Sequence, residues 1–322
     1  MNRLIGTYTG HEKGPLLFCL GAMHGNENAG VLALHRLLEM LDEEPDKNPD
    51  FLFCGRLVAI RGNVKANKVN QRFIKKDLNR QWTLETVERV KASNYEELDA
   101  EEQEMKAILE VMQQEIEAYQ PSKIIVLDIH TTTAHGGIFT IPSHDPESEK
   151  IALQLHAPVV KGLLEGLKGT TLHYFKTENF GIPTVGITFE AGQHDDPESV
   201  RNAVSAIVNC LRAIGCVPPK DIEAKHDNWL YERSQGLPKN TELIYKHTIH
   251  DGDQFEMLPG FKNFQFIPKN TPLAKSNNEI IKAQTDAFML MPLYQVQGDD
   301  GFFLIKEVRE AEINKLANPQ SS

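Results

Sequence analysis

Buried strands and amphipathic helices alternate along most of the chain. An apolar run at residues 16–20 stops at the polar segment 21–27, and apolar residues then recur at helical spacing over residues 31–41. This pattern predicts a buried strand, a tight turn and an amphipathic helix with Asn26 or Asn28 available as N-cap. In open α/β sheets, ligands bind beyond the carboxyl ends of the strands. The turn at residues 21–27 is therefore the first candidate site.

The same alternation continues to about residue 215. We expect strands at 56–60, 123–128, 137–142 and 183–189, and helices at 99–119, 149–167 and 197–213. Residues 42–50 are expected to form a polar linker, and residues 64–82 a long loop without apolar periodicity, a kind of loop that is often functional. The acidic run Glu101, Glu102 and Glu104 is typical of a solvated first helical turn. This alternation predicts an α/β layer fold with a mainly parallel sheet.

The pattern changes at Pro218 and Pro219. From about residue 241 the segments are short, alternate in polarity and are separated by turn residues, as expected for a small all-β domain. We therefore predict two domains, a catalytic α/β domain over residues 1–217 and a β domain over residues 218–322. His247 and His250 are three apart, so in a strand they would face opposite sides, and we assign them to a hairpin turn instead of a metal site.

Composition and charge narrow the class of protein. The chain has 322 residues, of which 40% are hydrophobic and 25% charged, as in soluble globular proteins. A net charge of -11 argues against nucleic acid or an anionic membrane as partner, but local arginines can still hold an anionic small molecule. The four cysteines are too few for a disulfide framework, and we see neither a signal peptide nor a membrane span. We expect a cytoplasmic protein; a homo-oligomer is left open.

Three residues have the types and positions of catalytic zinc ligands. His24 and Glu27 lie in the first strand-to-helix turn, and His130 follows the strand predicted at 123–128. A catalytic zinc binds three side chains and keeps a fourth position open for water. The same short spacing at His144 and Glu147 falls in a polar loop broken by proline, and we interpret it as incidental.

Glu190 and Asp128 are candidates for supporting roles next to such a metal ion. Glu190 ends another predicted strand, where a carboxylate can take a proton from activated water and deliver it to a leaving amine. A capping or solvated carboxylate is the alternative. Asp128 lies two residues before His130, on the same side of the strand, so it either orients a histidine ligand or is a buried structural residue.

The aperiodic loop contains candidate anion binders, namely Arg72, Asn79 and Arg80. Arginine presents a rigid pair of donors to carboxylates and can stabilise an oxyanion. Ordinary solvated loop arginines are the alternative. His135 and Tyr294 are further candidates for the pocket wall. We place His194 at the start of the next helix, outside the site.

Four motifs, taken in order, resemble a known family. HGNE at 24–27, DLNR at 77–80, DIH at 128–130 and FEAG at 189–192 are similar to the succinylglutamate desuccinylase/aspartoacylase family, which is related to zinc carboxypeptidases. The resemblance covers roughly residues 15–215. It implies a zinc-carboxypeptidase-like α/β/α sandwich with a mixed, mainly parallel sheet, followed by a small C-terminal all-β domain.

The resemblance also implies roles for individual residues. The zinc ligands it implies are His24, Glu27 and His130. Glu190 matches the general base and acid, and Arg72 matches the arginine that polarises the carbonyl. Asn79 and Arg80 match the pair that holds a substrate carboxylate, and Asn63 matches a motif asparagine without an assigned role.

One departure from the family pattern bears on the substrate. Aspartoacylase is expected to have another substrate-binding arginine shortly before its catalytic glutamate, but residues 176–181 contain none. This argues against N-acetylaspartate. Our hypothesis is a hydrolase with one Zn²⁺ per chain that cleaves the amide bond of a small, carboxylate-bearing N-acyl amino acid. The alternatives are a zinc carboxypeptidase acting on peptides and a non-catalytic binding protein on the same scaffold.

Overall fold

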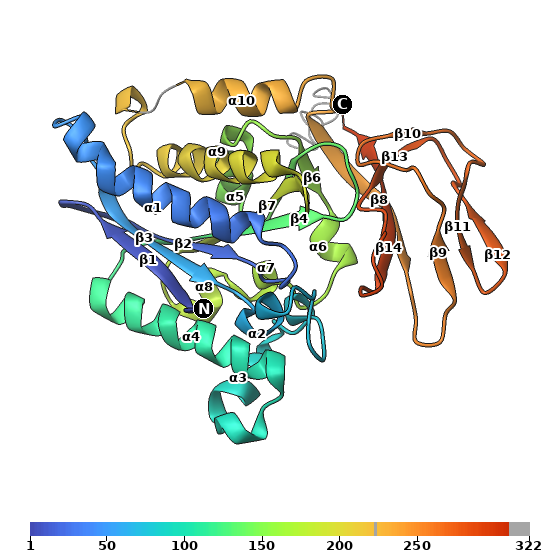
Figure 1. Cartoon of the computed structure of the whole chain (residues 1–322), viewed down its shortest axis with the longest axis horizontal. Coiled ribbons are helices and arrows are strands. Elements are labelled where there is room, and N and C mark those ends of the chain that lie inside the picture. Colours follow the sequence, from blue (N-terminus) through green and yellow to red (C-terminus); the bar gives the residue numbers. More distant parts are fainter. Residues whose placement is uncertain (222–223, 309–322) are drawn as a thin grey trace, which may run out of the picture.

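One large sheet forms the centre of the protein in the computed structural model, which describes residues 1–221 and 224–308 (Figure 1). The order of its strands is β1 (Leu4–Thr9), β3 (Cys54–Arg61), β2 (Glu12–Gly21), β4 (Ile124–Thr132), β7 (Thr184–Gln193), β5 (Phe139–Pro142), β6 (Val159–Lys161), β8 (Asn240–Thr248), β14 (Asp300–Glu307), β13 (Ala287–Leu290) and β10 (Phe266–Ile267). Strands β3, β2, β4 and β7 are parallel, whereas β1 and β5 run antiparallel to their neighbours β3 and β7. The predicted mixed, mainly parallel sheet is confirmed.

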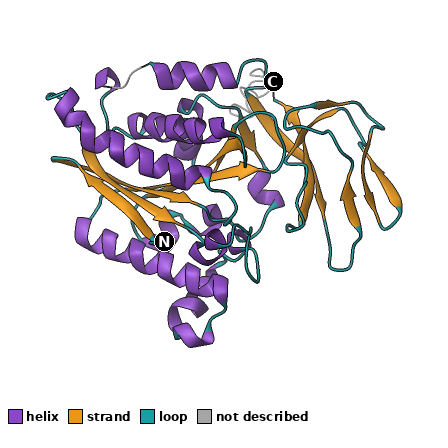
Figure 2. Ribbon diagram, in the orientation of Figure 1, coloured by secondary structure: helices purple, strands orange, loops and turns teal. Residues whose placement is uncertain are grey.

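Helices cover both faces of this sheet, which gives the predicted α/β/α sandwich (Figure 2). The longer helices are α1 (Ala29–Lys47), α3 (Leu84–Ala92), α4 (Ala100–Tyr119), α5 (Pro146–Gln154), α9 (Pro197–Ala213) and α10 (Lys225–Arg233). The short ones are α2 (Val64–Lys68), α6 (Leu163–Gly166), α7 (Thr171–Tyr174) and α8 (Thr177–Phe180), with 3₁₀ turns η1 (Leu78–Arg80), η2 (Tyr95–Glu97) and η3 (Pro219–Asp221).

Strand β2 shows why the central strands have uninterrupted apolar runs. Leu17 and Cys19 pack in the core cluster under α1 and α9, while Leu16, Phe18 and Leu20 pack in the cluster under α4. A strand covered on both faces needs apolar residues at every position. Each fully buried Leu or Phe side chain stabilises the fold by about 1.5–3 kcal/mol. This packing fixes the carboxyl ends of the strands, from which the site is built.

The C-terminal strands continue the large sheet and add a small one. Strand β8 pairs in parallel with β6, so the sheet runs on into β14, β13 and β10. Strands β12 (Glu279–Lys282), β11 (Pro272–Ser276) and β9 (Phe255–Met257) form a separate three-stranded sheet. The predicted C-terminal β segment is present, although residues 222–223 and 309–322 of the predicted domain lie outside the described residues.

The boundary predicted at residue 217 stays a prediction. Helix α10 follows this residue, was not expected, and packs against α9. Its Leu230 is fully buried in the core cluster under α1 and α9. The packing therefore assigns α10 to the α/β layers instead of the β strands.

Four predictions of secondary structure were wrong, and two of these segments contain a proline. Helix α1 runs to Lys47 through the expected linker, with Pro45 in its last turn, where it removes one backbone N–H donor from the helix. The expected helix over 149–167 breaks into α5, β6 and α6, since Pro158 favours an extended residue before it. The aperiodic loop contains α2 and η1.

The fourth concerns His247, which is on β8. The turn after β8 leads to β9 in the other sheet, so it is no hairpin, and the His247 ring stacks on Phe302 at 5.4 Å.

Across residues 1–221 and 224–308, no helix has both the length and the apolar composition needed to cross a bilayer.

Candidate active site

The carboxyl ends of two neighbouring strands bring His24, Glu27 and His130 together. Strands β2 and β4 are parallel and in register at Gly21 and Ile129, so the turn after β2 lies beside the end of β4. His24 Nδ1 lies 2.8 Å from Glu27 Oε1, and His130 Nδ1 lies 3.0 Å from Glu27 Oε2. All three residues are buried, and one ligand atom of each lies within 4.8 Å of the others. Two imidazole nitrogens and a carboxylate are a donor set that suits zinc.

Two further carboxylates lie beside the Nε2 atoms of His24 and His130. His24 Nε2 lies 3.1 Å from Asp77 Oδ1, and His130 Nε2 lies 3.0 Å from Asp128 Oδ2. Metal-binding histidines commonly donate their other ring N–H to a carboxylate, which fixes the ring and its tautomer. The arrangement therefore fits a metal on the Nδ1 side. The structure favours the orienting interpretation of Asp128, whereas the sequence did not single out Asp77 for this contact.

Nearby charges determine the protonation of His130 and Glu27. Burial favours the neutral form of His130, but the carboxylates of Asp128 and Glu27 outweigh it and raise the pKa of His130 well above its usual value. Burial likewise opposes the charged form of Glu27, but His24 and His130 outweigh it and lower the pKa of Glu27 well below its usual value. Without a metal, the cluster is therefore an ion pair between His130 and Glu27 at neutral pH.

Zinc binding is expected to release protons from this cluster. A ligand imidazole must be neutral, so His130 has to lose the proton that it holds below its raised pKa. Affinity should therefore rise with pH, and at least one proton should leave per zinc between about pH 6 and 8. Calorimetric titration of metal-free protein with zinc, in buffers of different ionisation enthalpy, measures this release. Binding that releases no proton and does not depend on pH would exclude His130 as a ligand.

Glu190 lies on β7, next to the candidate ligand His130. It pairs in register with His130 of β4, so the two backbones are neighbours in the sheet. Burial raises the pKa of Glu190 to about 8; Glu27 and Asp128 add to the shift, while His130 and Arg72 oppose it. Its buried Oε2 atom makes no hydrogen bond among the described residues. A buried, unpaired carboxyl group with a pKa near neutrality is suited to proton transfer.

Arg72 reaches the same place from the loop before η1. Its Nε and Nη2 atoms donate to Asp77 Oδ2 at 3.1 and 2.8 Å, and its Nη1 lies 3.6 Å from Glu27 Oε1. Asp77 thus binds Arg72 with one oxygen and His24 with the other. A single carboxylate therefore fixes the arginine relative to one candidate ligand.

Asn79 and Arg80 line the pocket, but both already have partners. Asn79 Oδ1 accepts from the Thr171 backbone N–H at 2.9 Å. Arg80 donates to the Asn79 backbone oxygen at 2.8 Å and forms an ion pair with Asp300 of β14. A substrate carboxylate at Arg80 would have to compete with Asp300.

The acidic first turn of α4 is not solvated, so this prediction was wrong. Glu101 is fully buried, Glu102 is 6% exposed and Glu104 is 4% exposed. Glu101 accepts from the backbone N–H groups of Ile74 and Lys75 at 2.7 and 3.0 Å. The Glu101 carboxylate thus accepts hydrogen bonds from backbone N–H groups in the loop between Arg72 and Asp77 and holds this loop in place.

Asn63, the motif residue without an assigned role, supports the same loop. Its side chain caps α2 by accepting from the Ala66 N–H and donates to Glu101 at 3.2 Å. Its role here is structural.

Glu101→Gln is expected to loosen this loop. The glutamine side chain would turn its NH₂ group toward a backbone N–H that needs an acceptor. Leaving a buried polar group without its partner costs about 1–3 kcal/mol of folding free energy. We expect a lower free energy of unfolding and a lower kcat/KM, because Arg72 and Asp77 lose their anchor. Denaturant unfolding and kinetics measure the two effects. The control is Glu117→Gln, which changes an exposed carboxylate on the same helix; equal effects of both variants would contradict the anchoring role.

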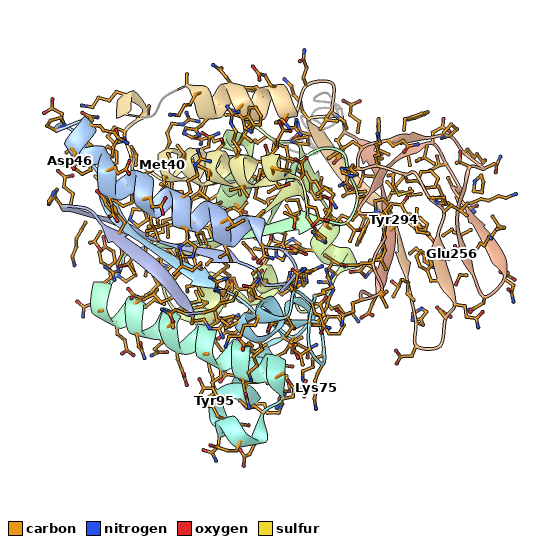
Figure 3. All side chains as sticks on the ribbon, viewed as in Figure 1. Met40, Asp46, Lys75, Tyr95, Glu256 and Tyr294 are labelled. Carbon is orange, nitrogen blue, oxygen red and sulfur yellow. The ribbon has the colours of Figure 1, made fainter. Side chains whose placement is uncertain are left out.

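One pocket of about 810 Å³, counted to its open mouth, is lined by the candidate residues His24, Glu27, Arg72, Asn79, Arg80, His130 and Glu190. His194, which we had placed outside the site, lines it and lies 2.7 Å from Thr131 Oγ1 through Nδ1. The residues along the wall do not include His135 or Tyr294. Tyr294 lies among the C-terminal strands (Figure 3), where its hydroxyl donates to the Leu258 backbone oxygen at 3.0 Å. A volume of this size suits a small molecule.

Solved structures of similar fold support this architecture. The product-bound ectoine utilization protein EutE (DoeB) from Ruegeria pomeroyi matches with a TM-score of 0.63 at 15% identity, covering 94% of this chain and 88% of that one. A succinylglutamate desuccinylase from Chromobacterium violaceum matches with a TM-score of 0.60 at 16% identity, covering 96% and 95%. At these identities the likeness concerns the fold alone.

Sequence relatives identify the family. A probable aspartoacylase from Nostoc sp. (strain PCC 7120 / SAG 25.82 / UTEX 2576) is 32% identical over 145 residues, which are 44% of this chain and 45% of the relative. The chain thus spans less than half the length of this curated relative. The model of the succinylglutamate desuccinylase/aspartoacylase catalytic domain matches residues 13–214. Because this match covers more than half of its length, the chain belongs to the succinylglutamate desuccinylase/aspartoacylase family.

Proposed function

We propose that this protein is a zinc-dependent hydrolase that cleaves the amide bond of N-acyl amino acids. One observation carries the proposal. Two histidines whose Nε2 atoms are held by carboxylates present their Nδ1 atoms beside Glu27, in a pocket where the Glu190 carboxyl group has an unpaired oxygen. Membership of a family named for two deacylases supports the same chemistry.

The residues divide the work of hydrolysis. His24, Glu27 and His130 would hold one zinc ion, which supplies a Lewis acid and a water activated near neutral pH by a pKa lowered to about 7. Glu190 takes a proton from the attacking water and passes it to the leaving amine nitrogen, so that amide and water become carboxylic acid and amine. Arg72, fixed by Asp77, stabilises the negative oxygen that develops on the carbonyl.

The substrate and location are part of the proposal. A small N-acyl amino acid fits the pocket, and its carboxylate would lie at the end formed by Asn79 and Arg80. Nucleic acid and anionic membranes are disfavoured as partners by the net charge of -11. Four free cysteines, three of them buried, support a reducing compartment such as the cytoplasm.

A panel of N-acetyl, N-succinyl and N-formyl amino acids, with dipeptides alongside and zinc supplied, tests this function. Turnover of N-acyl amino acids in preference to dipeptides is the expected result. Preference for dipeptides would favour the carboxypeptidase alternative. A protein that binds zinc but turns over no member of the panel would favour the binding-protein alternative.

A further inference from the structure

Both arginines that line the described pocket already have a carboxylate partner. Arg72 is paired with Asp77, and Arg80 is paired with Asp300. Asp300 is also 2.6 Å from Lys246 Nζ through its second oxygen. No arginine along the described wall is therefore left with an uncompensated charge for an additional carboxylate of a ligand.

Asp300 comes from a part of the chain distant from the metal cluster. It is the first residue of β14, and the register of β14 against β8 shifts between Asp300 and Phe302. Such irregularities re-aim side chains. Here the side chain of Asp300 is 12% exposed and lies on the pocket wall, 220 residues after Arg80 in sequence. A C-terminal strand of the large sheet thus places a carboxylate on the wall of the pocket.

The charges around this end of the pocket balance. Burial opposes ionisation of Asp300, but Arg80 and Lys246 outweigh it and lower its pKa, so the residue is an anion at neutral pH. Asp299 beside it is a further pocket-lining carboxylate that acts electrostatically on Arg80. The rest of the wall combines apolar side chains with uncharged polar ones, namely Ile141, Leu164, Leu167, Met291, Leu293 and Phe303 with Thr131, Thr132, Thr133, Thr170, Thr188, His194 and Gln295. Along this wall a second ligand carboxylate would meet two acids and uncharged side chains, but no arginine without a carboxylate partner.

We propose, building on the deacylase function above, that Asp300 is a specificity-determining residue. Asp300 binds Nη2 of Arg80, so the α-carboxylate proposed to lie there has to share this guanidinium with Asp300. No part of Arg80 is then left for a second carboxylate, and the pocket selects N-acyl amino acids whose acyl group and side chain are uncharged. A second substrate carboxylate has to displace Asp300 or remain without a cationic partner in the pocket, and both are costly. The absence of an arginine at 176–181 removes one attraction for a second carboxylate. Asp300 would add a repulsion.

N-acetylglutamine and N-acetylglutamate form the ligand pair that tests this role. They have nearly the same shape and the same α-carboxylate, so the ratio of their kcat/KM values isolates the second negative charge. For the zinc-loaded full-length protein we expect a preference for N-acetylglutamine of about tenfold or more, the cost of one unfavourable charge contact in a partly buried site. Asp300→Asn should lower this ratio by about tenfold, because Arg80 becomes free to pair.

Three further variants keep the test decisive. Glu307→Gln removes an exposed carboxylate from the other end of β14, roughly 23 Å away at about 3.3 Å per residue, and should leave the ratio unchanged. Asp300→Glu keeps the charge and should preserve the preference of the natural chain. Asp300→Ser replaces Asp300→Asn if the latter does not fold. The proposal would be overturned if the natural chain preferred N-acetylglutamate. It would also be overturned if Asp300→Asn and Asp300→Ser both left the ratio of kcat/KM values unchanged.

Failure of the deacylase function is recognised separately. If neither these two compounds nor any member of the panel above is hydrolysed, the proposed reaction is wrong. Calorimetric Kd values for the same two compounds then decide the role of Asp300. Asp300→Asn should tighten binding of N-acetylglutamate relative to N-acetylglutamine by about tenfold. An unchanged ratio of Kd values would overturn the selectivity role.

Discussion

Glu190→Gln is expected to lower kcat/KM on an N-acyl amino acid by about 10²–10⁴-fold, the range for loss of a general base. Glutamine has nearly the same shape but cannot accept the proton of the attacking water. The substitution also removes no candidate ligand, so the variant should still bind one zinc per chain. Kinetics and elemental analysis of the same preparation measure both quantities.

The matched control for this prediction is Asp195→Asn. Asp195 is an exposed carboxylate five residues further along the chain, and it does not line the pocket. Its substitution should leave both zinc content and turnover unchanged. Full activity of Glu190→Gln would show that another group transfers the proton, and simultaneous loss of zinc would assign Glu190 to the metal instead.

His24→Ala is expected to have the second large effect, loss of both zinc and activity. Mutation of groups that only orient metal ligands typically costs about 10–100-fold in affinity or activity, so loss of a ligand should exceed about a hundredfold. Two ligands would remain, too few for a tight catalytic site. Zinc affinity by competition with a chelating dye measures the change.

His194→Ala provides the comparison. His194 lines the same pocket but lies outside the cluster of His24, Glu27 and His130. We therefore expect unchanged zinc stoichiometry in this variant. If both alanine variants lost zinc equally, the ligand set would be wrong.

Apolar patterning predicted the central layers because burial on both faces leaves a direct trace in the sequence. The run at residues 16–20 falls within β2, and the helix expected at 197–213 matches α9. The predicted element boundaries were wrong near prolines, because a proline in the sequence does not show whether it lies inside a helix or before a strand. Pro45 sits inside the end of a helix, whereas Pro158 precedes the short strand β6.

The candidate site divides in the same way. His24, Glu27, His130 and Glu190 could be proposed from sequence because each comes shortly after an apolar run that predicts a strand. The roles of Asp77, Glu101 and Asp300 depend on contacts between segments 53, 27 and 220 residues apart. No local pattern marks such contacts. A buried carboxylate that accepts from a distant loop has the same sequence signature as a solvated one, which is why the acidic turn of α4 was misjudged.

Anomalous diffraction at the zinc edge, on crystals grown with zinc, tests the central claim most directly. The account predicts one strong peak per chain, at roughly 2.0–2.2 Å from His24 Nδ1, His130 Nδ1 and a carboxylate oxygen of Glu27. A peak bound elsewhere, or none at these three side chains with zinc in excess, would contradict it.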